Sequence, residues 1–104
     1  MAYKHPFPYR LHTLRKMRKI SQKELGIRIG LEPGSSSSRM NHYEKGRHTP
    51  DFSIIKLLAD ELKVPAYYFF CDSDEEAERA LRLYALSDEQ LEIIDKMLLE
   101  FTQK

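Results

Sequence analysis

Two short helices joined by a serine-rich turn are predicted between Ser21 and Glu44. Ser21 and Glu24 have the spacing of a capping box, which starts a helix because each residue bonds the free backbone amide of the other. Gly30 suits the left-handed residue that ends a helix, so this first helix has about ten residues. Gly26 lies inside it and allows another backbone to come close.

The second helix is expected after a turn at residues 32–34, with the serines at 35–38 as candidate N-caps. Met40 and Tyr43 are three residues apart and are expected to face a core, and Gly46 closes the helix. The polar residues left facing outward are Arg39, Asn41 and His42. A flexible linker is the alternative interpretation of the serine run.

Apolar residues at helical spacing predict two further helices. One precedes the pair and covers residues 10–19, and the other is a core helix over 52–62 with Asp51 as its N-cap. The aromatic run at residues 67–70 is expected to form a short fifth helix packed on the core, with stacking on single-stranded bases as the alternative. Ser87 and Gln90 have the spacing of a second capping box. The chain is therefore predicted to be all-α.

At these residues the chain resembles the helix-turn-helix domain of phage repressors, Cro proteins and XRE-type bacterial regulators. The resemblance covers about Arg10 to Phe70, and its motifs are Leu14-Arg15, Ser21-Gln22-x-Glu24-Leu25, Ile29-Gly30, Met40-x-x-Tyr43-Glu44-x-Gly46, Pro50 and Leu58-Ala59-x-x-Leu62-x-Val64-Pro65. The chain departs from the family pattern in two places. It is longer between Gly30 and Met40, and Gly26 stands where the family usually has alanine.

The resemblance implies a five-helix, phage-repressor-like helix-turn-helix domain with a C-terminal helical extension. We assign residues 10–71 to the DNA-binding domain, 1–9 to an N-terminal tail and 72–104 to the extension. The tail is expected to be loosely attached, and an arm on DNA formed by Lys4, His5 and Arg10 is the alternative.

Positive and negative charges are segregated along the chain. Residues 1–50 hold 11 Lys and Arg against 3 Asp and Glu, a formal charge of +8, whereas residues 51–104 hold 6 against 13, a charge of −7. A basic surface attracts and holds the phosphates of nucleic acid. Together with the resemblance, this charge predicts that the first half binds double-stranded DNA, with a merely solvated basic surface as the alternative.

Base contacts are expected from the start of the second helix of the motif, which usually enters the major groove. The candidate base-reading residues are Ser37, Ser38, Arg39, Asn41 and His42, and the candidate phosphate-binding residues are Gln22, Lys23, Ser36 and Arg47. Arginine can make a bidentate contact to guanine, and asparagine to adenine. The resemblance implies an internal ion pair between Arg15 and Glu44, with an exposed Arg15 touching phosphate as the alternative.

The extension carries an apolar helical face formed by Leu91, Ile94, Leu98 and Phe101. A chain of 104 residues cannot easily bury that whole face, so we expect it to form a homodimer, with packing onto the same subunit as the alternative. The lone Cys71 allows no internal disulfide and is expected to be a small, partly buried apolar residue. No apolar run is long enough to span a membrane, so a cytoplasmic protein is expected.

These features favour a transcriptional regulator, most simply a repressor that binds a palindromic operator as a homodimer. The alternative is an antitoxin-type module, whose acidic half neutralises a basic protein partner while the basic half represses its own operon. An enzyme is not expected, because no nucleophile and base, metal-ligand spacing or phosphate-binding glycine loop is present. No cofactor or metal is predicted.

Overall fold

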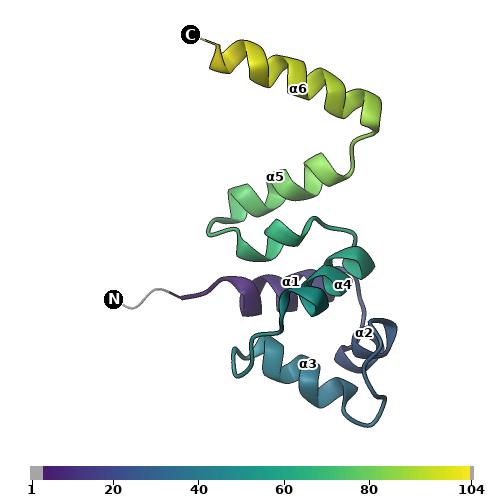
Figure 1. Cartoon of the computed structure of the whole chain (residues 1–104). Helices are drawn as coiled ribbons and strands as arrows, with labels where there is room; N and C mark the ends of the chain where they lie inside the picture. Colours follow the sequence, from purple (N-terminus) through teal and green to yellow (C-terminus); the bar gives the residue numbers. More distant parts are fainter. Residues whose placement is uncertain (1–3, 104) are drawn as a thin grey trace.

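The structure is a computed structural model that describes residues 4–103. Within that range every regular element is helical, which confirms the predicted all-α class. Figure 1 shows the elements in chain order, from α1 near the N-terminus to α6 at the C-terminus. They are α1 (Phe7–Met17), α2 (Gln22–Arg28), α3 (Ser36–Glu44), α4 (Phe52–Leu62), the 3-10 helix η1 (Ala66–Phe70), α5 (Asp74–Tyr84) and α6 (Asp88–Thr102).

Short polar side chains start most of these helices. Asp51 accepts a hydrogen bond from the backbone amide of Ile54, as predicted, and Ser73 does the same for α5. The capping box predicted at Ser87 is complete. The box predicted at Ser21 is only half formed, because the Glu24 carboxylate pairs with Arg28 one turn later instead of returning to the Ser21 amide.

Residues with positive φ end α2 and α3. Gly30 has φ 96° and Gly46 has φ 74°, a conformation that glycine adopts without steric cost. The extra residues before Met40 form a turn in which the Ser35 amide donates to the Glu32 carbonyl at 3.0 Å. The turn brings the chain to the start of α3 at Ser36, so the insertion leaves the recognition helix intact.

The first helix begins earlier than predicted. α1 starts at Phe7, and Phe7 is 1% exposed, with its ring centroid 5.3 Å from that of Phe69. Pro6 and Pro8 fit here because proline is tolerated in the first turn, where the backbone amide has no partner in the helix. The predicted tail of residues 1–9 is therefore wrong from Phe7 onward, and residues 1–3 lie outside the described range.

Arg10 is also buried, which excludes it from an arm on DNA. Its Nε donates to the Cys71 carbonyl at 3.0 Å, and its Nη1 pairs with Asp74 at 2.7 Å. These contacts tie the start of α5 to α1. Of the aromatic run, Tyr68 and Phe69 enter the core as predicted.

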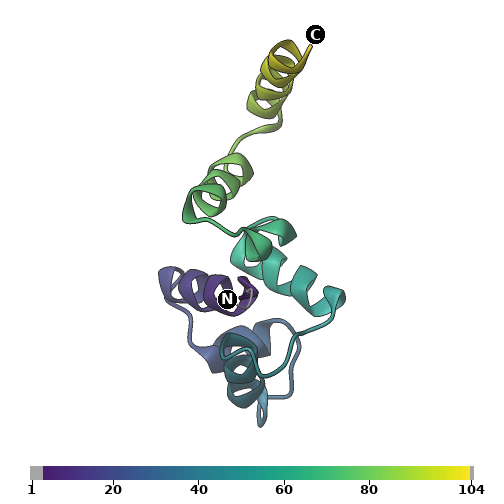
Figure 2. The same cartoon turned by 90° about the vertical axis from the view of Figure 1, so that its left-hand side faces the viewer.

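α6 stands away from the rest of the molecule (Figures 1 and 2). None of its residues is buried, and the molecule measures 54 by 37 by 22 Å along its principal axes. Cys71 is buried and free. Among the described residues, no helix is both long enough and apolar enough to cross a bilayer.

Candidate nucleic-acid interface

α2 and α3 cross at a point of very close contact. The Ser36 side chain is fully buried, and its Oγ donates to the Lys23 carbonyl at 2.6 Å. A Cβ atom on Gly26 would lie 1.9 Å from that Oγ, so glycine is required at position 26 as long as Ser36 remains. The prediction that Ser36 binds phosphate is wrong, because its hydroxyl is used inside the protein.

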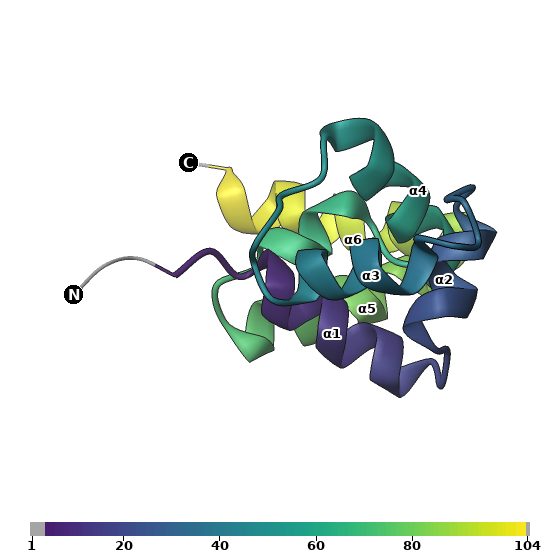
Figure 3. The same ribbon diagram turned by 90° about the horizontal axis from the view of Figure 1, so that it is seen from below.

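The first turn of α3 presents a polar surface to solvent. Ser37, Ser38 and Arg39 are exposed, whereas Met40 and Tyr43 are buried on the opposite side. Figure 3 views the molecule from the side of α2 and α3, and α3 lies in front of the rest of the body. Arg39 Nη2 donates to the Tyr43 hydroxyl at 3.2 Å, which holds its guanidinium along the helix. This arrangement suits insertion of the exposed face into a groove.

Two further residues predicted to read bases are half-buried and already have partners. The Asn41 side-chain oxygen accepts from Gln22 Nε2 at 3.2 Å, which leaves the Asn41 amide nitrogen free of that contact. The His42 ring stacks on the His48 ring, with centroids 5.2 Å apart and planes 17° apart. Both side chains are therefore positioned by contacts that bind α3 to its neighbours.

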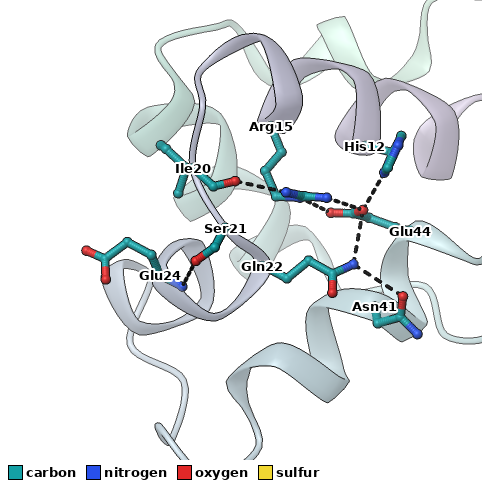
Figure 4. Close-up of polar contacts among 8 residues, drawn as sticks. All are labelled: His12, Arg15, Ile20, Ser21, Gln22, Glu24, Asn41 and Glu44. Carbon is teal, nitrogen blue, oxygen red and sulfur yellow. Dashed lines mark hydrogen bonds and ion pairs between the residues drawn. The ribbon is translucent and has the colours of Figure 1, made fainter.

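Arg15 and Glu44 form the ion pair that the resemblance implied (Figure 4). Arg15 Nε donates to Glu44 Oε2 at 2.6 Å, and Nη2 donates to Oε1 at 3.1 Å. The third guanidinium nitrogen, Nη1, donates to the Ile20 carbonyl at 2.9 Å. The Glu44 side chain is only 2% exposed, so this carboxylate and its partner lie inside the protein.

Glu44 has two more donors, which connect it to the candidate DNA contacts. His12 Nδ1 lies 2.7 Å from Oε1, and Gln22 Nε2 donates to the same oxygen at 3.2 Å. Burial raises the pKa of the Glu44 carboxyl, but hydrogen bonds from Arg15, His12 and Gln22 outweigh burial and leave the pKa below its ordinary value. The carboxylate thus joins α1, α2 and α3 while charged (Figure 4).

Cations flank α3 on two sides. A hollow of about 620 Å³ beside α2 is lined by the exposed residues Lys16, Lys19 and Lys23, together with Ser37. On the other side, the exposed Arg47 lies in the loop that follows α3. Gln22 is half-buried and lines the hollow as well, so it has access to solvent next to the lysines.

Sequence reasoning missed three of these positions. Lys16 and Lys19 were not among the predicted phosphate-binding residues, because periodicity alone does not show which side of a helix faces the next element. His12 had no recognisable partner in the sequence, and its contact with Glu44 joins residues 32 positions apart. The helical spacing of His12 and Arg15 was the only pattern that placed both on one face.

A comparison with known proteins decides the family. The sequence profile of the helix-turn-helix domain family matches residues 9–75. The chain belongs to this family. The match begins within α1 and includes all of α2, α3, α4 and η1, so the helix-turn-helix domain inferred from the sequence motifs is confirmed.

A transcriptional regulator of known structure is similar to this chain over most of its length. The crystal structure of the transcriptional regulator BswR is 35% identical to this chain, with a TM-score of 0.83. The similarity covers 90% of this chain and 93% of BswR, so it includes most of the C-terminal extension as well as the family domain. No curated protein sequence matches this chain significantly.

Proposed function

We propose that this helix-turn-helix protein is a transcriptional regulator that binds double-stranded DNA with sequence specificity. The observation that carries the proposal is the exposed polar first turn of α3, formed by Ser37, Ser38 and Arg39. In a helix-turn-helix domain this part of the second helix contacts base edges in the major groove. The similarity to BswR, a transcriptional regulator, supports the same role here.

The roles of the side chains follow from their exposure and chemistry. Ser37, Ser38 and Arg39 approach base edges first, and Arg39 has the donors for a bidentate contact to guanine. Asn41 and His42 lie further along α3 and contact bases with their free atoms. Gln22, Lys23 and Arg47 contact phosphates and fix the register of α3 in the groove.

The extension gives this regulator a means to dimerise. Leu98 and Phe101 are 53% and 76% exposed, and Leu91 and Ile94 on the same face of α6 are only half-buried. A second copy of the chain is the occupant that buries this face while placing two α3 helices around a two-fold axis. Such a dimer reads a near-palindromic operator with half-sites about 34 Å apart. Repression follows when the dimer occupies promoter DNA and excludes polymerase.

Selection of bound sites from a random duplex pool tests the proposal. The expected result is enrichment of one sequence with two-fold symmetry, bound about a thousandfold or more tightly than random DNA. Recovery of unrelated sequences, whose binding disappears as salt rises, would show only general attraction to phosphate. That result would contradict a sequence-specific regulator.

A second function is favoured by the charge of the C-terminal half. Residues 51–104 carry a formal charge of −7, and the apolar face of α6 is exposed beside these acidic residues. An acidic and apolar surface suits a basic protein, as in an antitoxin that neutralises a toxin. Purification from native cells distinguishes the two functions, because a simple repressor needs no partner whereas an antitoxin co-purifies with one small basic protein in a fixed ratio.

A further inference from the structure

A second group of lysine and histidine side chains lies beside the loop that follows α3. A hollow of about 450 Å³ is lined by the start of the described chain and by this loop. Lys4 and His5 contribute from the first segment, and Lys45 and His48 from the second. Among the described residues that line the hollow, none is acidic. Two lysines gathered in one concave surface favour a bound anion, because their charges repel one another until it arrives.

The N-terminal side of the hollow is held in place by the core. The His5 ring contacts the Phe70 ring edge-on, with centroids 5.5 Å apart, and His5 Nδ1 accepts from the Phe7 amide at 3.1 Å. Phe7 is buried, so the chain that carries Lys4 starts from a fixed point. A side chain that is already positioned loses less entropy when it binds a ligand.

The loop side of the hollow packs against the same segment. A Cβ atom on Gly46 would lie 3.5 Å from the Pro8 ring, which shows how close the loop and the start of α1 are. His48 stacks on His42 of α3, so the loop is also connected to the recognition helix. Movement of the hollow relative to α3 is therefore restricted by contacts on both sides.

The hollow lies near the DNA-facing side of the molecule. Seen from that side, the N-terminal segment and the loop between α3 and α4 lie together at one end of α3, and α2 lies at the other end (Figure 3). The lysines beside α2 and the two lysines of this hollow thus flank α3 from opposite ends. A duplex whose major groove holds α3 brings its phosphates to both ends.

We propose that Lys4, His5, Lys45 and His48 form a second phosphate-binding site for the DNA backbone. The ligand is a phosphodiester of the duplex, and the lysines supply charge while the histidine rings supply hydrogen-bond donors. The inference rests on the proposed function, because it assumes that α3 faces DNA. It adds the N-terminal segment to an interface that otherwise consists of the helix-turn-helix and its following loop.

The salt dependence of DNA binding tests the site. The variants are Lys4→Gln and Lys45→Gln, and the control is Arg82→Gln, which removes one charge from α5 on the far side of the body from α3 (Figure 1). The salt slope is the slope of the logarithm of the binding constant against the logarithm of the salt concentration. Each lost phosphate contact reduces its magnitude by about 0.9. The fold decrease in affinity between 50 and 200 mM salt is therefore about threefold smaller for each variant than for the wild type. The control is expected to keep the wild-type slope.

Each variant is measured on the selected operator and on an unrelated duplex of the same length. The expected decrease in slope is equal on both, because phosphate contacts carry no sequence information. The inference would be overturned if both lysine variants kept the wild-type salt slope. It would also be overturned if the slope changed on the operator but not on the unrelated duplex. Failure of the wild-type protein to prefer any sequence would instead contradict the proposed function, while the slope on unrelated DNA would still decide the inference.

Discussion

Glu44 connects more of the candidate interface than any other single residue we describe. Its carboxylate accepts hydrogen bonds from Arg15, His12 and Gln22, and Gln22 in turn donates to Asn41. A candidate phosphate contact and a candidate base contact are therefore both positioned by one buried charge. Loss of that charge is expected to affect folding and DNA recognition together.

Replacement of Glu44 by glutamine is expected to destabilise the fold by about 3 kcal/mol, because the buried Arg15 loses its counter-charge. Urea denaturation of Glu44→Gln measures this loss. The charge-matched control Glu92→Gln, on exposed α6, should remain within about 0.5 kcal/mol of wild type. Equal stability of both variants would contradict a structural role for the pair.

The same carboxylate predicts a pH dependence of stability. Its pKa is lowered in the folded state, so its contribution is fully present above the ordinary value of 4.5 and is lost as pH falls from there through the folded-state pKa. Wild-type protein should therefore lose more stability than Glu44→Gln between neutral pH and acid. Thermal unfolding of both proteins across this pH range measures the difference. If stability falls equally with pH in both, the Glu44 carboxylate is not the source of the pH dependence.

Gly26 predicts an unusual response to alanine. Alanine normally stabilises a helix by about 1 kcal/mol relative to glycine. Here its Cβ would collide with Ser36, so Gly26→Ala should destabilise the protein by about 1 to 3 kcal/mol. The double variant Gly26→Ala/Ser36→Ala removes the Oγ. Its loss of unfolding free energy should be smaller than the sum of the losses in the two single variants. Additive free energies of unfolding would show that the two residues do not compete for this space.

The helix-turn-helix elements could be predicted from local patterns in the sequence. Ser21, Asp51 and Ser87 are N-caps, and Gly30 has the expected left-handed conformation. Each of these depends on residues within one helical turn, so the sequence contains the whole pattern. The prediction failed at Phe7, which was assigned to a loosely attached tail, because its burial against Phe69 depends on a residue 62 positions away.

Long-range contacts explain most of the other differences. The burial of Ser36 depends on the close approach of α2, and the burial of Arg10 depends on acceptors in residues more than 60 positions away. A basic or polar residue looks exposed in the sequence until its partner is known. The Arg15–Glu44 pair was expected only because the motif around it resembled a family in which these positions pair.

The elements α3 and its following loop are predicted to differ in how they contribute to binding. Arg39→Ala should relax the preference at one base position of the selected operator by about 1 to 3 kcal/mol, because arginine discriminates guanine through two hydrogen bonds. Arg47→Ala should weaken binding to all duplexes alike and reduce the salt slope by about 1. Titrations of both variants against single base-pair changes test this division. Uniform weakening by both would contradict it.

The attachment of α5 depends on Arg10. Its hydrogen bonds to the Cys71 carbonyl and to Asp74 involve a charged donor and are worth about 1.5 to 3 kcal/mol. Arg10→Met should therefore increase amide hydrogen exchange within α5 and leave the α2 amides nearly unchanged. Arg82→Met, which removes an exposed arginine of α5, is the control. Exchange that rises equally in α2 and α5 would indicate general destabilisation instead.

The whole molecule combines a body that carries the proposed DNA-binding face with a last helix, α6, none of whose residues is buried. α6, which stands apart from the body (Figure 2), carries exposed apolar residues that the proposed dimer would bury. Phe101→Glu should convert a dimer into a monomer, because a charge in an apolar interface is costly to bury. Sedimentation equilibrium measures the mass, with Gln103→Glu at the end of α6 as the charge control. A wild-type monomer at micromolar concentration would contradict the dimer.

The exposed face of α3 is proposed to read a DNA sequence. The most direct test is to measure the dissociation constants of the full chain for the selected duplex and for a scrambled duplex of equal length, at two salt concentrations. We predict a ratio of about a thousand or more that persists when salt weakens both complexes. Equal constants for the two duplexes at both salt concentrations would contradict sequence reading and leave only electrostatic attraction to the backbone.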